Sequence, residues 1–352
     1  MAMKKILFTG GGSAGHVIPN IALIEELLST GEADICYMGT DGIEKDLITE
    51  WKLPYYQIEC PKLIRGGGWR GFKKNLKIPT AFYRAKKQAE AGHRAFQPDL
   101  VFSKGGYVAL PVVFAARKLK IPCLAHESDL SIGLANRLSA GKCENILTSF
   151  PETAEKVRRG KYTGAPLRRS VLSATRAEAR KKFGIPFGEK VLLVFGGGSG
   201  SRALNEALRK HLKSLTGKYY VLHLCGKGNA VESNLKNYRQ IEFALDMGEL
   251  YACADLIISR AGAGTVFEIL ALKKPAILVP LEGATRGDQK QNAKYFEKKG
   301  LCRVLAQSEL DRLAEEIEHA FLDEALKDRL AVGNFGRGNE NILREIRSYL
   351  RK

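Results

Sequence analysis

The sequence predicts an α/β protein made of two parallel-sheet domains, and three observations lead to this fold class. Short apolar segments alternate with amphipathic segments along the chain, which is the pattern of repeated strand–helix–strand units. A glycine-rich turn follows the first predicted strand at residues 10–15, and the pattern begins again with a similar turn at residues 196–200. The 352 residues are also enough for two domains of ordinary size. We therefore expect one domain over residues 1–163 and a second over residues 164–339.

The first predicted domain begins with a strand that runs directly into the first glycine-rich turn. Proline fits the first turn of a helix, so Pro19 is expected to open the helix that follows, and Gly31 is expected to end it. The remaining elements follow from apolar periodicity. The expected strands are residues 4–9, 34–38, 55–58, 100–103, 123–125 and 145–149, and the expected helices are residues 19–30, 43–51, 111–119 and 133–139.

The second predicted domain begins after a segment rich in glycine and proline, residues 162–168, which we interpret as the interdomain linker. A further glycine near residue 338 is expected to break the chain before its last helix. The expected strands are residues 190–195, 219–224, 241–243, 256–259, 276–280 and 301–304. The expected helices begin after residue 264 and near residue 289, and span residues 310–321 and 342–350.

Residues 259–292 hold the densest group of candidate ligand-binding side chains. Two predicted strands end there, close together in sequence, and parallel α/β sheets bind ligands at the edge where their strands end. Thr265 is the expected N-cap of a helix. The start of that helix, after Gly264, offers backbone N–H groups and a positive dipole end to a diphosphate.

Three polar side chains in the same stretch suit a sugar nucleotide. Glu268 lies one turn into the predicted helix, where a carboxylate can accept hydrogen bonds from a ribose diol. Gln289 and Asn292 lie three residues apart on one helical face, where their amides can hold sugar hydroxyls. The stretch taken alone is equally consistent with an ordinary strand–turn–helix unit.

Both glycine-rich turns allow backbone N–H groups to approach a phosphate. Neither is a P-loop, because no Lys-Ser/Thr pair follows the glycines, and the first turn fits the dinucleotide pattern G-x-G-x-x-G only loosely. His16 closes the first turn. It is either a general base at neutral pH or a structural histidine bonded to a loop carbonyl.

The formal net charge of +18 favours an anionic partner, which includes a membrane surface, a nucleic acid or a phosphorylated substrate. The excess is spread over both halves of the chain. Residues 62–87 differ from the rest because they carry nine cations and no acid, interleaved with Trp, Phe, Tyr, Leu and Ile. This pattern is typical of a segment that lies on an anionic bilayer, and it also fits a helix whose aromatic side chains pack inward. The sequence contains no nucleic-acid-binding motif.

Three further features favour the cytoplasm. No apolar run reaches membrane-spanning length, and the N-terminal residues lack the form of a signal peptide. The seven cysteines are scattered without metal-ligand spacing, which indicates reduced core thiols.

Seven short motifs occur in order between about residues 6 and 300. They are Gly11-Gly-Ser-Ala-Gly-His16 with Pro19, Gly105-Gly-Tyr107, His126-Glu-Ser-Asp129, Gly164-Ala-Pro-Leu-Arg168, Gly197-Gly-Ser199 with Leu204-Asn205, Arg260-Ala-Gly-Ala-Gly-Thr265 with Glu268, and Gln289 with Asn292-Ala293. Together they resemble the MurG family, the bacterial glycosyltransferases that make lipid II. The resemblance implies a GT-B fold, in which two Rossmann-like domains face a central cleft and a final helix, here about residues 340–352, packs back on the N-terminal domain.

The resemblance also implies a reaction and its setting. The expected reaction is inverting transfer of GlcNAc from UDP-GlcNAc to the C4 hydroxyl of MurNAc in lipid I, the undecaprenyl-pyrophosphoryl-MurNAc-pentapeptide, for peptidoglycan synthesis. No cofactor and no metal ion are expected. The protein is expected at the cytoplasmic face of the cell membrane, held peripherally on the anionic inner leaflet. Cell-wall and division machinery are expected partners, and nucleic acid is not.

The residues that would act in this reaction follow from the same resemblance. Most of the nucleotide would be held by the C-terminal domain, with Glu268 on the ribose, the Ala244 backbone beside the uracil and Gln289 on the sugar. His16 would face the reaction from the other domain, and Asp129 is a second candidate base. The remaining expected contacts to UDP-GlcNAc are Ser13, Ala14, Gly15, Arg168, Ser199, Ala263, Gly264, Thr265 and Asn292.

The sequence departs from the family pattern at three places. Ser13-Ala14 stand where the family has Thr-Gly, Asp129 replaces an asparagine, and Gly200 replaces a glutamine. These changes leave open a paralogue that transfers a UDP-sugar to another lipid acceptor. They also leave open an inactive module that binds a nucleotide sugar.

Overall fold

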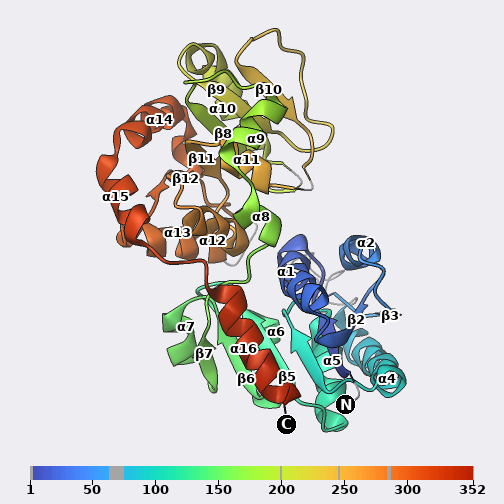
Figure 1. Ribbon diagram of the computed structural model, residues 1–352. Helices are drawn as coiled ribbons and strands as arrows, with labels where there is room; N and C mark the ends of the chain where they lie inside the picture. The colour runs from blue at the N-terminus through green and yellow to red at the C-terminus, as the bar shows by residue number, and fades with distance from the viewer. Residues whose placement is uncertain (1–2, 63–74, 199, 245, 284–286, 352) are drawn as a thin grey trace. The chain divides into compact units, whose positions relative to one another are not determined.

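The computed structural model describes residues 3–62, 75–198, 200–244, 246–283 and 287–351. These residues form two compact units (Figure 1). The first unit contains Met1–Arg168 together with Gly336–Lys352, and the second contains Arg169–Phe335. The sequence had placed the two divisions of the chain at residues 163 and 339.

The N-terminal unit is built on a seven-stranded parallel sheet with the order β3-β2-β1-β4-β5-β6-β7. The strand order reverses direction beside β1, because β2 lies on one side of it and β4 on the other. Such a switch point leaves a ligand-binding crevice at the carboxyl ends of the two central strands. The strands are β1 (Lys4–Thr9), β2 (Ala33–Gly39), β3 (Tyr55–Gln57), β4 (Leu100–Ser103), β5 (Cys123–Glu127), β6 (Asn145–Thr148) and β7 (Gly160–Tyr162).

Helices cover both faces of this sheet, because successive side chains of a strand point to opposite faces. In β1, Ile6 and Phe8 join the core under α1 and α16, whereas Leu7 joins the core under α4 and α5. The helices of the unit are α1 (Ala14–Thr30), α2 (Ile43–Thr49), α4 (Ile78–Phe96), α5 (Ala109–Lys118), α6 (Leu134–Ser139), α7 (Pro151–Lys156) and α16 (Gly338–Leu350).

The last helix, α16, returns to the N-terminal unit after the chain has built the other unit (Figure 1). Its apolar face, which includes Ile342 and Ile346, is buried in the same core as β1. Asn339 pairs with the backbone of Leu167 in both directions, at 2.8 Å for each hydrogen bond. Near the far end of the helix, Arg347 makes a two-pronged ion pair with Glu32, which lies between α1 and β2.

The C-terminal unit repeats the architecture with a six-stranded parallel sheet of order β10-β9-β8-β11-β12-β13. The order again reverses beside the first strand, because β9 and β11 flank β8. The strands are β8 (Val191–Phe195), β9 (Tyr220–Leu224), β10 (Tyr238–Ile241), β11 (Leu256–Ser259), β12 (Ala276–Leu278) and β13 (Arg303–Val304). The helices are α8 (Arg169–Ser173), α9 (Arg176–Phe183), α10 (Arg202–Thr216), α11 (Gly248–Cys253), α12 (Ala263–Ala271), α13 (Asp288–Lys298), α14 (Leu313–Leu322) and α15 (Glu324–Val332).

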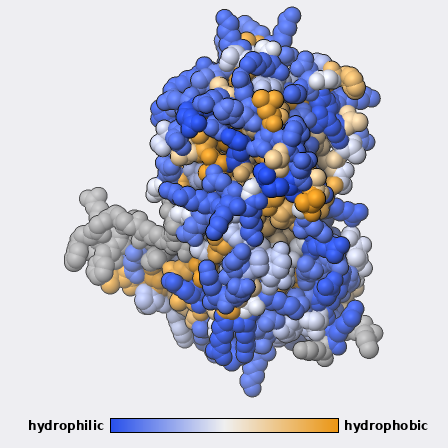
Figure 2. Space-filling view, turned by 90° about the vertical axis from the view of Figure 1, so that its left-hand side faces the viewer, coloured by the Kyte–Doolittle hydropathy of each residue, from blue (hydrophilic) through white to orange (hydrophobic). Residues whose placement is uncertain are grey.

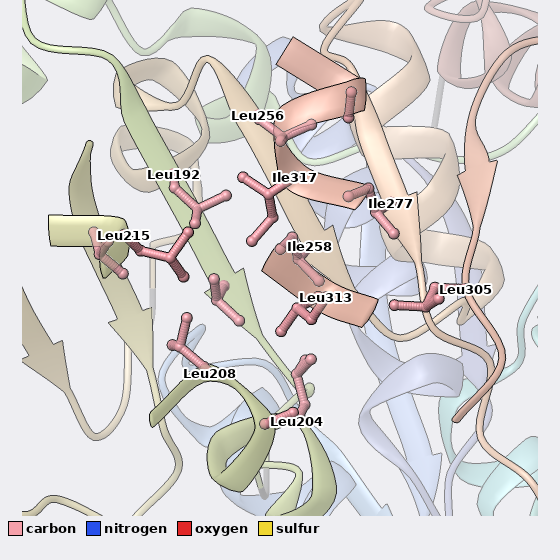
Figure 3. Close-up of a cluster of buried hydrophobic side chains, with 14 of the residues drawn as sticks. Leu192, Leu204, Leu208, Leu215, Leu256, Ile258, Ile277, Leu305, Leu313 and Ile317 are labelled. Atoms are coloured by element: carbon pink, nitrogen blue, oxygen red, sulfur yellow. The ribbon is translucent and has the colours of Figure 1, made fainter. Parts of the chain in front are cut away.

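One face of this second sheet packs on α10 and α14. Figure 3 shows Leu192 and Ile258 of the sheet converging with Leu208 of α10 and with Leu313 and Ile317 of α14. All of these side chains are fully buried. Burial of a leucine or isoleucine of this kind contributes about 1.5–3 kcal/mol, so this cluster fixes the loops at the carboxyl edge of the sheet.

Two predicted helix starts are wrong. Helix α1 begins at Ala14, so Pro19 lies inside the helix and removes only a hydrogen bond near its first turn. The N-cap of α12 is Gly262 with extended backbone, and Thr265 therefore lies within the first turn instead of capping it. In both cases the helix begins earlier than predicted and includes residues that the sequence pattern had assigned to the preceding loop. The centre of the basic segment, residues 63–74, lies outside the described residues.

Candidate active site

The glycine-rich turn of the C-terminal unit connects β8 to α10 at the switch point of the sheet. Ser201 is the N-cap of α10, and its hydroxyl accepts a hydrogen bond from the N–H of Leu204. Gly197 has a φ of 93°, and a Cβ at either Gly197 or Gly198 would meet no atom within 4 Å. The turn therefore exposes bare backbone beside a helix N-terminus, which is the geometry that binds phosphate oxygens.

Gly200 has a different role in this turn. A Cβ at this position would lie 2.2 Å from the carbonyl oxygen of Cys225, and its φ is 77°. Asn205 donates to that same carbonyl at 2.8 Å and is held in turn by His223. The glycine that stands where the family has glutamine is thus required by the path of the backbone in this chain.

Arg260, directly after β11, is a buried cation behind this turn. Its side chain is 9% exposed, and it donates to the Ser201 hydroxyl at 2.7 Å and to the carbonyl oxygens of Val279 and Pro280. It also reaches Gln307 at 2.7 Å. Burial lowers the pKa of the guanidinium, but an arginine remains charged. Arg260, which follows β11, joins the segments that follow β8, β12 and β13, and it places one positive charge beside the glycine turn.

Helix α12 begins one turn after Arg260 and carries the predicted ribose ligand. A Cβ at Gly262 or Gly264 would also meet open space, so this second helix N-terminus is accessible as well. Glu268 is buried one turn further on, and the hydroxyl of Tyr251 donates to its Oε2 at 3.0 Å. The tyrosine fixes the orientation of the carboxylate, which is expected for a group that must accept hydrogen bonds in a set geometry.

Helix α13 packs against α12 through an edge-to-face contact of Phe267 and Phe296, with ring centroids 5.4 Å apart. Gln289 and Asn292 both lie on α13. The carbonyl oxygen of Gln289 accepts from the N–H of Leu281 at 2.9 Å, so the group that Gln289 offers to a ligand is its NH₂. Asn292 is fully buried.

The glycine-rich turn of the N-terminal unit is filled by the protein itself. A Cβ at Gly11 would lie 2.5 Å from the carboxyl carbon of Glu44, and a Cβ at Gly12 would lie 2.4 Å from the ring of Tyr107. The fully buried Glu44 accepts from the N–H of Gly12 at 3.1 Å and from the N–H of Thr40 at 3.0 Å. A buried carboxylate thus occupies the inner side of this turn, where it would repel a phosphate.

His16 lies in the first turn of α1, beside the chain that follows β4. Its Nδ1 is 3.2 Å from the carbonyl oxygen of Lys104. Because a carbonyl oxygen can only accept, Nδ1 carries the proton and a neutral His16 presents its lone pair on Nε2. A Cβ at Gly106 would lie 3.0 Å from the His16 ring, so this glycine makes room for the imidazole.

Lys104 and the loop after β5 complete the carboxyl edge of this sheet. The Lys104 side chain is 1% exposed, and its ammonium donates to the hydroxyl of Ser128 at 2.6 Å. Burial lowers the pKa of Lys104 to about 8, against the opposing effect of the Glu127 and Asp129 carboxylates. Glu127 organises the loop by accepting from the N–H groups of Asp129 and Gly133.

The structure places the predicted site residues in two groups. Ala263, Gly264, Thr265 and Glu268 lie on α12, Gln289 and Asn292 lie on α13, and the half-buried Ala244 follows β10, all in the C-terminal unit. Ser13, Ala14, Gly15, His16 and Asp129 lie at the carboxyl edge of the N-terminal sheet. Arg168 is the last residue of the first segment of the N-terminal unit, and Ser199 lies outside the described residues.

Three charged residues of these edges were given no role from the sequence. They are Glu44, Lys104 and Arg260, and each is almost fully buried. Each one directly follows a strand or lies at the start of the next helix. This position in the predicted strand–helix pattern could have identified them as candidate site residues. Charge pattern alone does not identify such residues, because most lysines, arginines and glutamates are solvated.

Part of the predicted membrane-binding segment is described, from Asn75 onwards. Leu76 and Tyr83 are 63% and 61% exposed, and Figure 2 shows hydrophobic surface on this unit where α4 begins. Inward packing also occurs, because Phe82 contacts Phe114 edge to face. Among the described residues, each helix is too short or too polar to cross a bilayer.

Two parallel-sheet units, each with a glycine-rich turn at its switch point, are the architecture of the GT-B fold. The N-terminal domain of glycosyltransferase family 28 matches residues 6–148, and the C-terminal domain of the same family matches residues 191–333. The crystal structure of MurG from Acinetobacter baumannii superposes with a TM-score of 0.76 and 26% identity, and the match covers 98% of this chain and 99% of that one.

Two curated relatives match over nearly their whole length. Proteins of Clostridium perfringens (strain SM101) and Clostridium botulinum (strain Langeland) are 42% and 39% identical to this chain. The matches cover 97% and 99% of this chain and 98% and 99% of the relatives. Both are named UDP-N-acetylglucosamine–N-acetylmuramyl-(pentapeptide) pyrophosphoryl-undecaprenol N-acetylglucosamine transferase. The chain belongs to the MurG family within glycosyltransferase family 28.

Proposed function

We propose that this protein transfers GlcNAc from UDP-GlcNAc to the C4 hydroxyl of MurNAc in lipid I, with inversion at the sugar. The observation that carries the donor half of this proposal is the carboxyl edge of the C-terminal sheet. Two helix N-termini open there beside exposed glycine backbone, and the buried Arg260 lies behind them. The names of the clostridial relatives supply the acceptor half.

UDP-GlcNAc would bind with its diphosphate over residues 197–200 and the start of α12. The ribose hydroxyls would reach Glu268, whose orientation is fixed by Tyr251. The sugar would be held by the NH₂ of Gln289, and the fully buried Asn292 would act only from behind the sugar site. The uracil would lie near the backbone of Ala244. Ser199 and Arg168 would add contacts to the phosphates, and Ser13, Ala14 and Gly15 would contribute backbone and hydroxyl groups from α1.

The leaving group in this reaction is UDP, whose negative charge grows as the glycosidic bond to phosphate breaks. Groups that already point at the place where the charge develops stabilise the transition state most effectively. Helix N-termini and a buried guanidinium meet this requirement, because they are held in place by the fold before the donor binds.

The acceptor hydroxyl must lose a proton as it attacks the sugar, so a proton acceptor is needed. His16 and Asp129 are the candidates on the N-terminal unit. Both flank the buried Lys104, His16 through the Lys104 carbonyl and Asp129 through the loop that carries Ser128. The imidazole lone pair on Nε2 and the carboxylate of Asp129 are each chemically able to take the proton.

We also propose that the protein acts as a peripheral enzyme on the cytoplasmic face of the cell membrane. The support is the exposed Leu76 and Tyr83 next to cations of α4 such as Arg84 and Lys87. Association with cell-wall and division machinery is proposed from the family resemblance alone. Flotation with anionic vesicles checks the membrane proposal, because the double variant Leu76→Asp with Tyr83→Asp should stay with the soluble fraction when the native protein floats.

The decisive experiment is transfer of radiolabelled GlcNAc from UDP-GlcNAc to a lipid I analogue in detergent. We expect a disaccharide-linked lipid product and stoichiometric release of UDP. Donor binding with turnover only on a different polyprenyl acceptor would indicate a paralogue. Donor binding without turnover on any lipid would indicate a binding module. Either result would contradict the proposed function.

A further inference from the structure

The reaction as described so far assigns no role to the buried ammonium of Lys104. Its side chain lies at the switch point of the N-terminal sheet, directly after β4, and is 1% exposed. A lysine in such a place is costly to bury unless neighbouring groups offset its charge. The groups around it show which ones do so.

The charged and titratable groups that surround Lys104 come from three segments. From α1, the His16 ring bonds to the Lys104 carbonyl, so it is placed by the backbone and not by the ammonium. From β5, His126 is neutral, because burial and the Lys104 charge hold its pKa well below its usual range. Glu127 and Asp129 supply the negative charges that interact with the ammonium.

The two carboxylates are not equivalent. The side chain of Glu127 accepts three hydrogen bonds, from the N–H groups of Asp129 and Gly133 and from the amide of Asn136, at 2.7 to 3.1 Å. These three hydrogen bonds explain Glu127 as the residue that holds the loop. Asp129 is the residue that replaces the amide of the family pattern, and its extra negative charge lies within two residues of Glu127. Two neighbouring carboxylates disfavour each other's ionisation unless a cation offsets them.

We propose that Lys104 is a positioning residue that, through Ser128, holds Asp129 in place and keeps its carboxylate ionised as the proton acceptor for the lipid acceptor's hydroxyl. The proposal rests on the proposed function. In the reaction, the hydroxyl oxygen forms a bond to C1 of GlcNAc, the bond from C1 to the UDP oxygen breaks, and the hydroxyl proton passes to Asp129. UDP takes the electron pair of the broken bond, and Lys104 itself exchanges no proton with the substrate.

This arrangement predicts how the rate depends on pH. Asp129 must be ionised, so the rate is lost at low pH. The Lys104 ammonium must be protonated, so its support is lost as pH rises through its pKa of about 8. The native enzyme is therefore expected to show an acid limb and a basic limb, with the basic limb due to Lys104.

The test uses Lys104→Met, which removes the charge at nearly constant volume. We expect kcat at pH 7 to fall by about 10–100-fold, the acid limb to move up by about one pH unit or more, and the basic limb near pH 8 to disappear. Lys156→Met, at an exposed lysine of the same unit, is the matched control and should keep the native profile. Thermal unfolding and calorimetry with UDP-GlcNAc show that each variant is folded and binds donor.

A double-mutant cycle separates positioning from a merely structural role. If Lys104 acts through Asp129, Lys104→Met should cost at least tenfold less in the Asp129→Asn background than in the native protein. Ser128→Ala, which keeps the ammonium but removes its hydrogen-bond partner, should shift the acid limb in the same direction by a smaller amount. This variant keeps the test decisive if Lys104→Met is unstable.

Three results would overturn the inference. They are an unchanged pH profile in Lys104→Met, costs that add without coupling to Asp129→Asn, and a folded Lys104→Met protein with no turnover at any pH. The last result would mean that Lys104 does more than support Asp129. Failure of the proposed function is a separate outcome, because then the native protein itself would not transfer GlcNAc to lipid I.

Discussion

The two glycine-rich turns look alike in sequence, yet they occupy opposite environments in the structure. In the N-terminal unit, Gly11 and Gly12 lie against Glu44 and Tyr107, and an added Cβ would collide with these side chains. In the C-terminal unit, Gly197 and Gly198 face open space, and the buried cation of Arg260 donates to Ser201 at the end of the turn. One turn is packed on a carboxylate and the other lies in front of a guanidinium.

This difference teaches that a glycine-rich turn after a strand has two distinct uses. Glycine can make room for a side chain of the same protein, or it can make room for a ligand. The charge behind the turn distinguishes the two uses, because a diphosphate is attracted by Arg260 and repelled by Glu44. We therefore assign phosphate binding to the C-terminal turn, and proton chemistry to the edge that contains the N-terminal turn.

The largest expected effect is on turnover, and it comes from variants at the carboxyl edge of the N-terminal sheet. These variants test whether this edge takes part in proton transfer without binding the donor. Loss of the proton acceptor should lower turnover by about 10²–10⁴-fold while UDP-GlcNAc affinity stays nearly unchanged. We expect this result for Asp129→Asn and a smaller loss for His16→Ala, measured by steady-state transfer and calorimetry. A large loss in His16→Ala with native-like activity in Asp129→Asn would make His16 the base. Native turnover in both variants would contradict the assignment of this edge.

The next effect concerns the ribose ligand of the C-terminal edge. Glu268→Ala removes hydrogen bonds to a charged group, so donor binding should weaken by about 1.5–3 kcal/mol. Tyr251→Phe, which keeps the carboxylate but frees its orientation, should weaken binding less. Isothermal calorimetry with UDP-GlcNAc measures both, and an unchanged affinity in Glu268→Ala would remove this residue from the donor site.

A pair of glycine substitutions compares the two turns directly. Gly198→Ala adds a methyl group to open space, so the fold should tolerate it while the donor Kd rises about tenfold or more, because backbone can no longer approach the phosphates. Gly12→Ala places a methyl group against Tyr107 at a φ of 81°, so it should destabilise the protein by about 1–3 kcal/mol.

Denaturant unfolding and donor calorimetry on both variants complete this comparison. Gly12→Ala serves as the control for Gly198→Ala, because its donor affinity should remain native in the folded fraction. If Gly12→Ala weakened UDP-GlcNAc binding without loss of stability, the N-terminal turn would be the phosphate site and the comparison would be reversed.

The smallest expected effect is acid sensitivity of the C-terminal unit through His223. Burial lowers the pKa of His223 from 6.5 to about 4, so the unfolded chain binds a proton between these values that the folded chain does not. Stability should therefore fall as pH falls, by about 1.4 kcal/mol between pH 7 and 5.5. His223→Gln should show a weaker dependence in urea titrations at the two pH values. If both proteins lost the same stability between the two pH values, His223 would not be the source of the acid sensitivity.

Much of this fold was predictable because its strands are short apolar runs bounded by turn residues and its helices have clear periodicity. Helix starts were harder, as α1 and α12 show, since both begin inside segments that look like glycine loops. The positions of Glu268 on α12 and Gln289 on α13 followed from the strand–turn–helix pattern, and their roles stay predictions. The buried charges of Glu44 and Arg260 were not, because their roles depend on partners far away in the chain.

The return of α16 to the first unit has a consequence for the order in which the protein is made. The ribosome completes all of Arg169–Phe335 before it synthesises the helix that closes the core around β1. Domains generally fold as units during synthesis, so the C-terminal unit, although it comes second in the chain, has every residue it needs earlier than the N-terminal unit does. The glycine-rich turn of the C-terminal unit is thus complete at a time when the N-terminal sheet, whose edge carries His16 and Lys104, is not yet covered by α16. A shortened chain without α16 would expose the apolar face of the N-terminal unit and leave the other unit intact.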